Sequence, residues 1–275
     1  MKYSGIIFDF DGVLLESEFA GNKHIADYLT GIGHPTTTDQ SMENFMGLSG
    51  PDFIRALEQW IGRSLPEDFH AARAEEDRRV LEEGLEAVVG AVVFIESLPL
   101  DLPRAIASSS STRWIRRHLD HLGLSDQFEG RIFSGAEHVR RGKPAPDLYL
   151  HAADMLGGIL GRAEGDDFAL LGGAGRKPGP RGDHQGGLAV IFGDLRRRYG
   201  RGVRAIAADA LGVEIGKCVI VEDSPVGVSG ALASGADVIG LCAGRHCTIG
   251  HADRLRSLGV RRIATSFEEV AEMMA

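Results

Sequence analysis

Residues 3–12 read YSGIIFDFDG, an apolar run that leads directly into two aspartates and a glycine. The apolar run predicts a buried strand that ends at Phe8. Asp9 and Asp11 stand one residue apart on the turn after this strand, where both carboxylates can face one site, and Gly12 permits a tight backbone. Such a pair suits a hard cation such as Mg²⁺, and a carboxylate can also attack a phosphoryl group. An acidic turn with no catalytic role is the alternative at this point.

Strands and helices alternate in the last two thirds of the chain. Four short apolar runs predict strands there, at 104–107, 132–133, 218–221 and 237–241. Helices are expected between them, one over 114–122 and another from Pro146. This alternation is typical of a parallel sheet that is covered by helices on both faces and binds ligands at the carboxyl ends of its strands. The predicted fold class is therefore α/β, a doubly wound, Rossmann-like parallel sheet.

Residues 16–90 have a different character, because they are rich in charge and carry apolar residues at helical spacing, with no clear strand. Pro51 is a good first helical residue, and the apolar positions after it predict a helix. Pro66 is expected to open another helix, with acidic residues in its first turn. Roughly four packed helices would account for this stretch. We expect a small helical-bundle cap domain at 16–90 and a catalytic core at 1–15 and 91–275.

A segment dense in glycine and arginine, at about 158–209, interrupts the pattern of the core. It lies between two similar stretches, AADMLG at 152–157 and AADALG at 207–212, which is consistent with an insertion through a small duplication. Much of the segment is turn-forming. Weaker patterns inside it predict a strand at 188–192 and a helical turn at 194–199.

Composition excludes several classes of protein. The 275 residues carry a formal charge of −9, which argues against general nucleic-acid binding, because that affinity comes largely from the neutralisation of phosphates. No apolar run is long enough to span a membrane, and the first residues lack the pattern of a signal peptide. We expect a globular cytoplasmic protein, a monomer or a homodimer, with neither a nucleic-acid nor a membrane partner.

The three cysteines, Cys218, Cys242 and Cys247, are too few for a disulfide framework and lack the paired spacing of a zinc site. His246 and His251 lie close to Cys247 in the sequence. A loop with scattered polar residues is favoured over a metal site there.

Three further polar clusters follow predicted strands or lie in a rigid turn. Ser108 comes after an apolar run, and its hydroxyl could hold a phosphate oxygen, although serine is also a common helix cap. Lys143 precedes two prolines in the sequence GKPAPD, where its ammonium could neutralise a phosphoryl group. Glu222 and Asp223 end an apolar strand, where burial of carboxylates without a cation would be costly. Each cluster by itself is also compatible with a structural role.

Taken in order, the four clusters resemble the motifs of the haloacid dehalogenase-like phosphohydrolase superfamily. The motifs are DFDGVLLES, IASSSS, GKPAPDLY and VIVEDSPVG, and they cover the chain from end to end apart from the inserted segment. The second aspartate favours phosphate-ester chemistry over the dehalogenases, which lack it. The resemblance also implies that the helical stretch is the cap that closes over the active site in one branch of this superfamily.

The resemblance implies a role for each matched residue. Asp9 would be the nucleophile and Asp11 the general acid and base, while Ser108 and Lys143 would hold the phosphoryl oxygens. The implied cofactor is Mg²⁺, with the expected ligands Asp9, Asp11 through its backbone carbonyl, Asp223, and Glu222 either directly or through water. The residues expected to bind the substrate are Ser17, Gly47, Ser109 and Ser110.

Within this branch, the sequence is similar to the beta-phosphoglucomutases and the sugar-phosphate phosphatases. A mutase needs extra cations for a second phosphate, which the mutases carry in a cap loop and in a Lys-Asn pair after the second motif. Here the cap loop reads MGLSG at 46–50, and SSST at 109–112 replaces the pair, although Arg113, Arg116 or Lys23 could substitute. We expect a phosphatase that hydrolyses a small phosphorylated metabolite, a sugar or polyol phosphate, through an aspartyl-phosphate. A phosphosugar mutase and a non-catalytic interaction protein are the alternatives.

Overall fold

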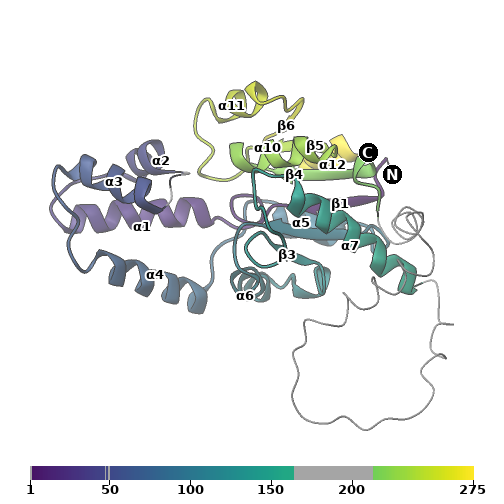
Figure 1. Ribbon diagram of the computed structural model, residues 1–275, viewed down its shortest axis with the longest axis horizontal. Helices are drawn as coiled ribbons and strands as arrows, with labels where there is room; N and C mark the ends of the chain where they lie inside the picture. Colours follow the sequence, from purple (N-terminus) through teal and green to yellow (C-terminus); the bar gives the residue numbers. More distant parts are fainter. Residues whose placement is uncertain (1, 47, 49, 164–212) are drawn as a thin grey trace, which may run out of the picture.

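The computed structural model describes residues 2–46, 48, 50–163 and 213–275. Its centre is a six-stranded parallel sheet with the strand order β3-β2-β1-β4-β5-β6 (Figure 1). In chain order, the strands are β1 (Gly5–Phe8), β2 (Arg104–Ser108), β3 (Ile132–Ser134), β4 (Cys218–Glu222), β5 (Asp237–Leu241) and β6 (Arg262–Ala264). The first strand lies in the middle, and the winding direction reverses there, as in other doubly wound sheets.

Helices cover both faces of this sheet. One face packs against α5 (Ala91–Ser97), α6 (Thr112–Leu122) and α12 (Phe267–Met274), and the other packs against α7 (Asp147–Ala163), α10 (Pro225–Ser234) and α11 (His251–Ser257). Alternate residues of one strand enter opposite cores: Ile6 and Phe8 pack on the first face and Ile7 on the second. Because both faces are buried, β1 is a continuous apolar run. The predicted fold class is confirmed.

The first four helices after β1 are α1 (Ser17–Gly31), α2 (Thr38–Phe45), α3 (Gly50–Ile61) and α4 (Phe69–Glu83). They lie to one side of the sheet (Figure 1) and pack around a separate apolar core of Ile25, Leu29, Phe45, Leu57 and Phe69. A capping box begins α2, in which Thr37 and Gln40 each accept a hydrogen bond from the other's backbone N–H.

Several element boundaries differ from the sequence predictions. The helix expected at Pro66 begins at Phe69, because a turn closed by the N–H of Phe69 on the carbonyl of Pro66 precedes it. Ser108 and Glu222, expected just after their strands, are the last residues of β2 and β4. The elements α11, β6 and α12 were not predicted. A three-residue edge strand such as β6, with two half-buried residues, is too short to show a periodic pattern.

Most of the segment at 158–209 lies outside the described residues. The helix α7 continues through Ala163, so the first part of the segment is helical. The strand predicted at 188–192, the turn at 194–199 and the second similar stretch at 207–212 lie outside the described residues. No helix in the described part of the chain is both long and apolar enough to cross a membrane.

Candidate active site

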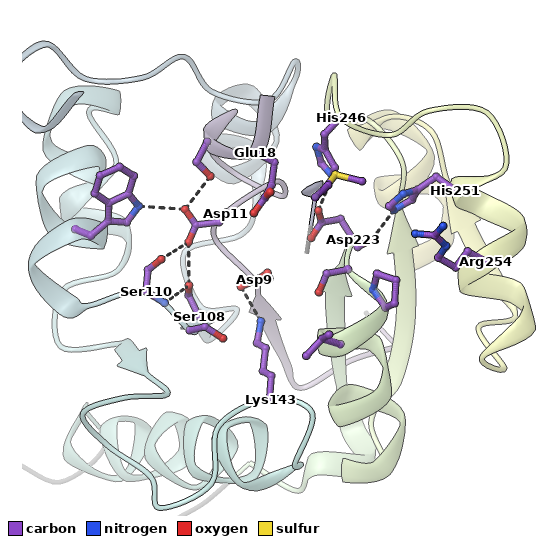
Figure 2. Close-up of a pocket in the computed structure, with 17 residues that line it drawn as sticks. Asp9, Asp11, Glu18, Ser108, Ser110, Lys143, Asp223, His246, His251 and Arg254 are labelled. Carbon is purple, nitrogen blue, oxygen red and sulfur yellow. Dashed lines mark hydrogen bonds and ion pairs between the residues drawn. The ribbon is translucent and has the colours of Figure 1, made fainter. Parts of the chain in front are cut away.

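The carboxyl ends of three neighbouring strands meet at one edge of the sheet (Figure 2). Asp9 follows β1, Ser108 ends β2, Glu222 ends β4, and Asp223 comes next. Because β1 pairs in parallel with both β2 and β4, these polar residues lie side by side although they are far apart in the sequence. This arrangement places the polar clusters of the sequence motifs around one site.

Lys143 lies in the turn before α7 and points between two carboxylates. Its Nζ atom is 2.7 Å from Asp9 Oδ1 and 2.7 Å from Glu222 Oε1, and its side chain is 4% exposed. The hydroxyl of Tyr149, on α7, donates a hydrogen bond to Glu222 Oε1 at 2.9 Å. Burial lowers the pKa of Lys143, but the carboxylates of Asp9 and Glu222 outweigh this effect and raise it well above its ordinary value. Lys143 therefore provides a fixed positive charge beside Asp9.

Asp9, Glu222 and Asp223 form a compact, buried acidic cluster. One oxygen from each carboxylate lies within 4.8 Å of the other two. Burial raises the pKa of Asp9 well above its usual range, and Lys143 offsets this only in part. Burial and the neighbouring Glu222 likewise raise the pKa of Asp223. Burial opposes the charge of Glu222 too, but Lys143 outweighs it and lowers the pKa of that carboxyl.

The acidic cluster has the composition of a site for a hard cation. Asp223 Oδ1 is buried and has no hydrogen-bond partner within the described residues. Carboxylates held this close together repel one another, and a divalent cation between them would remove that cost. Oxygen donors of this kind are the ligands that Mg²⁺ takes in proteins.

Gly12 allows the turn after β1 to approach Asp223. Its φ is +81°, in the left-handed region, and a Cβ atom at this position would lie 2.2 Å from Asp223 Oδ2. Any other residue at position 12 would strain the backbone and displace that carboxylate.

The carboxylate of Asp11 accepts hydrogen bonds from four side chains (Figure 2). Ser17 Oγ and Trp114 Nε1 donate to Oδ1 at 2.8 and 3.1 Å, while Ser108 Oγ and Ser110 Oγ donate to Oδ2 at 3.2 and 2.5 Å. The donors come from α1, α6, the end of β2 and the loop after it. Together they set the direction in which this carboxylate faces the site.

The loop after β5, residues 242–250, contacts Asp223 from the other side. His246 Nε2 lies 2.7 Å from Asp223 Oδ2, and His251 Nε2 lies 2.6 Å from the backbone oxygen of Asp223. Both histidines are buried, and burial lowers the pKa of each ring. The loop therefore holds the side chain of Asp223 through His246, and His251, the first residue of α11, holds its main chain.

Comparison with known proteins identifies the family. The sequence model of the haloacid dehalogenase-like hydrolases matches residues 3–170, which is more than half of the chain. The chain belongs to the haloacid dehalogenase-like hydrolases.

This hydrolase is similar to two phosphatases of Escherichia coli strain K12. It is 28% identical over 159 residues to fructose-1-phosphate phosphatase YqaB, a match that covers 57% of this chain and 81% of the relative. It is 29% identical over 160 residues to hexitol phosphatase A, covering 57% and 70%. A solved hydrolase of the same superfamily from Deinococcus radiodurans, with bound phosphate and sodium, aligns with a TM-score of 0.71 at 24% identity, covering 100% of this chain and 96% of the other. At that identity the structural match supports the fold alone.

A pocket of about 420 Å³ opens above the strand ends of the hydrolase. All four predicted catalytic residues line it: Asp9, Asp11, Ser108 and Lys143. Of the residues predicted to bind the substrate, Ser17, Ser109 and Ser110 line the pocket, and Gly47 lies outside the described residues. Asp223 lines it as well, whereas Glu222 is fully buried behind Lys143.

The sequence reasoning missed several lining residues: Glu18, Trp114, His246, His251 and Arg254. Glu18 directly follows the first motif, and its position beside Ser17 could have indicated it. Burial, and then the nearby Asp11, raise the pKa of its carboxyl. His246 follows β5, the neighbour of β4, so the rule that ligands bind at strand ends applied to it too. Trp114 had no such signal, because its spacing within α6 is that of a core residue.

Proposed function

We propose that this chain is a Mg²⁺-dependent phosphatase that hydrolyses a small phosphorylated metabolite through an aspartyl-phosphate. One observation carries the proposal: Lys143 lies 2.7 Å from Asp9 at the pocket, next to the acidic cluster. A carboxylate nucleophile, a fixed ammonium and oxygens that suit a divalent cation are what phosphoryl transfer requires. The relatives named as fructose-1-phosphate phosphatase and hexitol phosphatase support a sugar or polyol phosphate as the substrate.

In the first step, a carboxylate oxygen of Asp9 attacks the phosphorus atom, and the bond from phosphorus to the substrate's alcohol oxygen breaks. Asp11, in its protonated form, donates its proton to that oxygen, so the alcohol leaves uncharged. Lys143 and Ser108 contact the phosphoryl oxygens, and the ammonium offsets their negative charge. The phosphoryl group is then bound to Asp9.

In the second step, Asp11 accepts a proton from a water molecule whose oxygen attacks the phosphorus atom. The bond between phosphorus and the Asp9 oxygen breaks, inorganic phosphate leaves, and Asp9 is again a carboxylate. The proton from water replaces the one that left with the alcohol, so one turnover restores both residues.

The donor set of the acidic cluster fits Mg²⁺. The proposed ligands are the carboxylates of Asp9, Glu222 and Asp223 and the backbone carbonyl of Asp11. The unpaired Asp223 Oδ1 and the raised pKa of Asp223 are the observations that support a cation there. When bound, the cation offsets the charge shared between Asp9 and the phosphoryl group.

The proposal is tested by hydrolysis of a chromogenic phosphate ester with metal-free protein. We expect hydrolysis after Mg²⁺ is added and its loss after the cation is chelated. A screen of phosphorylated metabolites then identifies the substrate class, with sugar and polyol phosphates expected among the best substrates. Failure to hydrolyse any ester in the presence of Mg²⁺ would favour a non-catalytic member of the family that acts as an interaction protein.

We also propose that α1 to α4 form the cap domain, over residues 16–90. Ser17 and Glu18, at the start of α1, and Met46, just after α2, line the pocket beside the motifs of the sheet. The separate apolar core of these helices would let them move as a unit on the sheet domain. Such a movement would exclude water from the phosphoryl group and select the substrate.

A phosphosugar mutase is the second candidate, and the cations that line the pocket support the phosphatase over it. Three cationic residues could replace the missing mutase residues: Arg113, Arg116 and Lys23. None of them lines the pocket that the described residues form. Arg254, in the last turn of α11, does line it and is the observation that keeps a second phosphate site in consideration.

We predict that a sugar 1-phosphate is hydrolysed or left unchanged and is not converted to the 6-phosphate. The reason is that a single lining arginine, Arg254, replaces the several cations that a second phosphate would need. ³¹P nuclear magnetic resonance with a catalytic amount of sugar bisphosphate measures both products. Isomerisation that is faster than hydrolysis would contradict the proposal that the protein is a phosphatase.

We predict that Asp11→Asn lowers kcat by about 10²–10⁴-fold, because the amide can neither donate a proton to the leaving alcohol nor accept one from water. The amide keeps the shape of the side chain and can still accept hydrogen bonds from Ser17 or Ser110. The loss should be smaller for esters of acidic phenols, which need no proton to leave. If Asp11→Asn slows the first step equally for phenol esters and alkyl esters, Asp11 does not act as the general acid.

A further inference from the structure

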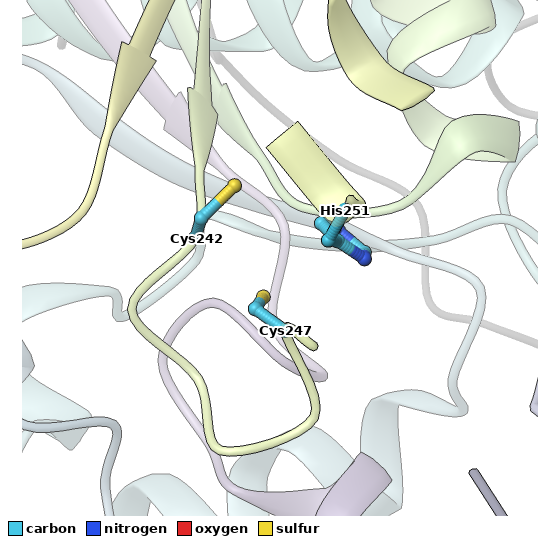
Figure 3. Close-up of side chains that lie close together, drawn as sticks. All are labelled: Cys242, Cys247 and His251. Atoms are coloured by element: carbon cyan, nitrogen blue, oxygen red, sulfur yellow. The ribbon is translucent and has the colours of Figure 1, made fainter. Parts of the chain in front are cut away.

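Two cysteines and a histidine that phosphoryl transfer does not use lie together beside the active site (Figure 3). Cys242 follows β5, Cys247 lies in the loop after it, and His251 begins α11. The two Sγ atoms and one ring nitrogen of His251 all lie within 4.8 Å of one another. The irregular spacing of these residues in the sequence argued against a metal site, but the loop brings them together.

The chemistry of this cluster differs from that of the acidic cluster. Two sulfurs and an imidazole are soft or borderline ligands, which favour zinc over Mg²⁺, whereas Asp9, Glu222 and Asp223 offer only oxygen. Both cysteines are free and partly buried, and His251 is buried. The two clusters would therefore select different cations.

The distances suit zinc. Tetrahedral Zn–S bonds of about 2.3 Å place two sulfur ligands about 3.8 Å apart. The ligand atoms within 4.8 Å of one another thus need to move by no more than about an ångström to bind the ion. Such a movement is within the reach of a surface loop, and Cys247 lies on one.

A partner of His251 outside the cluster supports the same assignment. Its Nε2 atom lies 2.6 Å from the backbone oxygen of Asp223, which makes Nε2 the protonated nitrogen. Metal-binding histidines commonly donate their second ring N–H to a carbonyl in this way, because the bond orients the ring and leaves the other nitrogen free as a ligand. The hydrogen bond at Nε2 leaves Nδ1 as the ring nitrogen of His251 that can bind zinc.

We infer that Cys242, Cys247 and His251 form a second metal site that binds Zn²⁺, separate from the proposed Mg²⁺ site. Both thiols bind as thiolates and release their protons to solvent, and their two negative charges balance the ion. Three protein ligands leave one position of a tetrahedral zinc site for water. Since His251 also contacts Asp223, bound zinc would fix the loop beside the catalytic residues.

Zinc binding to the reduced, metal-free protein tests this site in the presence of excess Mg²⁺. We expect one equivalent of zinc by elemental analysis. We also expect Co²⁺ at the same site to give thiolate-to-cobalt charge-transfer absorption, which oxygen ligands do not produce. Cys242→Ser and Cys247→Ser should each weaken zinc binding by at least about 100-fold. If a cysteine variant fails to fold, His251→Gln serves as a third variant. Its amide can still donate a hydrogen bond to the backbone oxygen of Asp223.

Two control variants should bind zinc as the parent does. Cys218→Ala removes the remaining cysteine, which is buried in β4 away from the cluster. Asp9→Asn removes a proposed Mg²⁺ ligand, so retention of zinc by this variant separates the two sites. The inference is overturned if the parent binds no zinc, or if the cysteine variants bind it as well as the parent.

Discussion

Replacement of Asp9 by asparagine is expected to lower kcat by at least about 10⁴-fold, the order of loss that follows removal of an enzyme's nucleophile. The amide has nearly the same shape as the carboxylate, but it carries no negative charge and is a far weaker nucleophile. Steady-state hydrolysis of a chromogenic phosphate ester in Mg²⁺ measures the loss. A variant with activity within about tenfold of the parent would rule out covalent catalysis by Asp9.

The folded state should survive this replacement. Burial raises the pKa of Asp9, and the nearby Glu222 and Asp223 raise it further, so its charge is unfavourable in the metal-free protein. A carboxyl whose folded pKa is raised costs stability once the pH exceeds its unfolded pKa, and an amide does not have this cost. The metal-free Asp9→Asn variant should therefore melt at the parent's temperature or above it at neutral pH. A clear fall in melting temperature would mean that the lost activity reflects unfolding.

Much of the candidate site at the edge of the sheet could be predicted from the sequence, for a physical reason. In a parallel sheet the strands are buried on both faces and read as apolar runs, so polar residues at their carboxyl ends are conspicuous. Asp9, Ser108 and Asp223 each lie at such an end. The topology then places them together, because ligands bind at the carboxyl ends of neighbouring strands.

The side chains that reach the site from helices and loops could not be predicted in the same way. Trp114 has the spacing of a core residue in α6, and nothing local to it indicates that its indole N–H donates to Asp11. His246 and His251 contact Asp223 from the loop after β5 and from the start of α11, whose path depends on packing against other parts of the chain. The conformation of a loop of this kind is set by tertiary contacts and leaves no periodic pattern in the sequence.

Replacement of Lys143 by methionine is expected to lower both activity and stability. Methionine keeps the apolar stem but removes the ammonium that lies 2.7 Å from both Asp9 and Glu222. Without it, two buried carboxylates have no opposite charge between them, and a broken buried ion pair typically costs about 3–5 kcal/mol. The phosphoryl group also loses a fixed positive charge, which we expect to lower kcat by at least about 10³-fold. Urea unfolding and steady-state kinetics measure the two effects separately.

A second change distinguishes catalysis from structural support. In the double variant Lys143→Met with Glu222→Gln, one carboxylate that the lysine neutralised becomes an uncharged amide. Its oxygen can accept the hydrogen bond from the backbone N–H of Ser224, and its NH2 group can donate to the hydroxyl oxygen of Tyr149. Most of the lost free energy of unfolding should return, since Asp9 is then the only carboxylate that has lost the opposite charge of Lys143. The single variant Glu222→Gln completes the double-mutant cycle. Activity should stay low, because the amide cannot replace an ammonium at the phosphoryl oxygens. Recovery of kcat together with stability would show that Lys143 acts only through the fold.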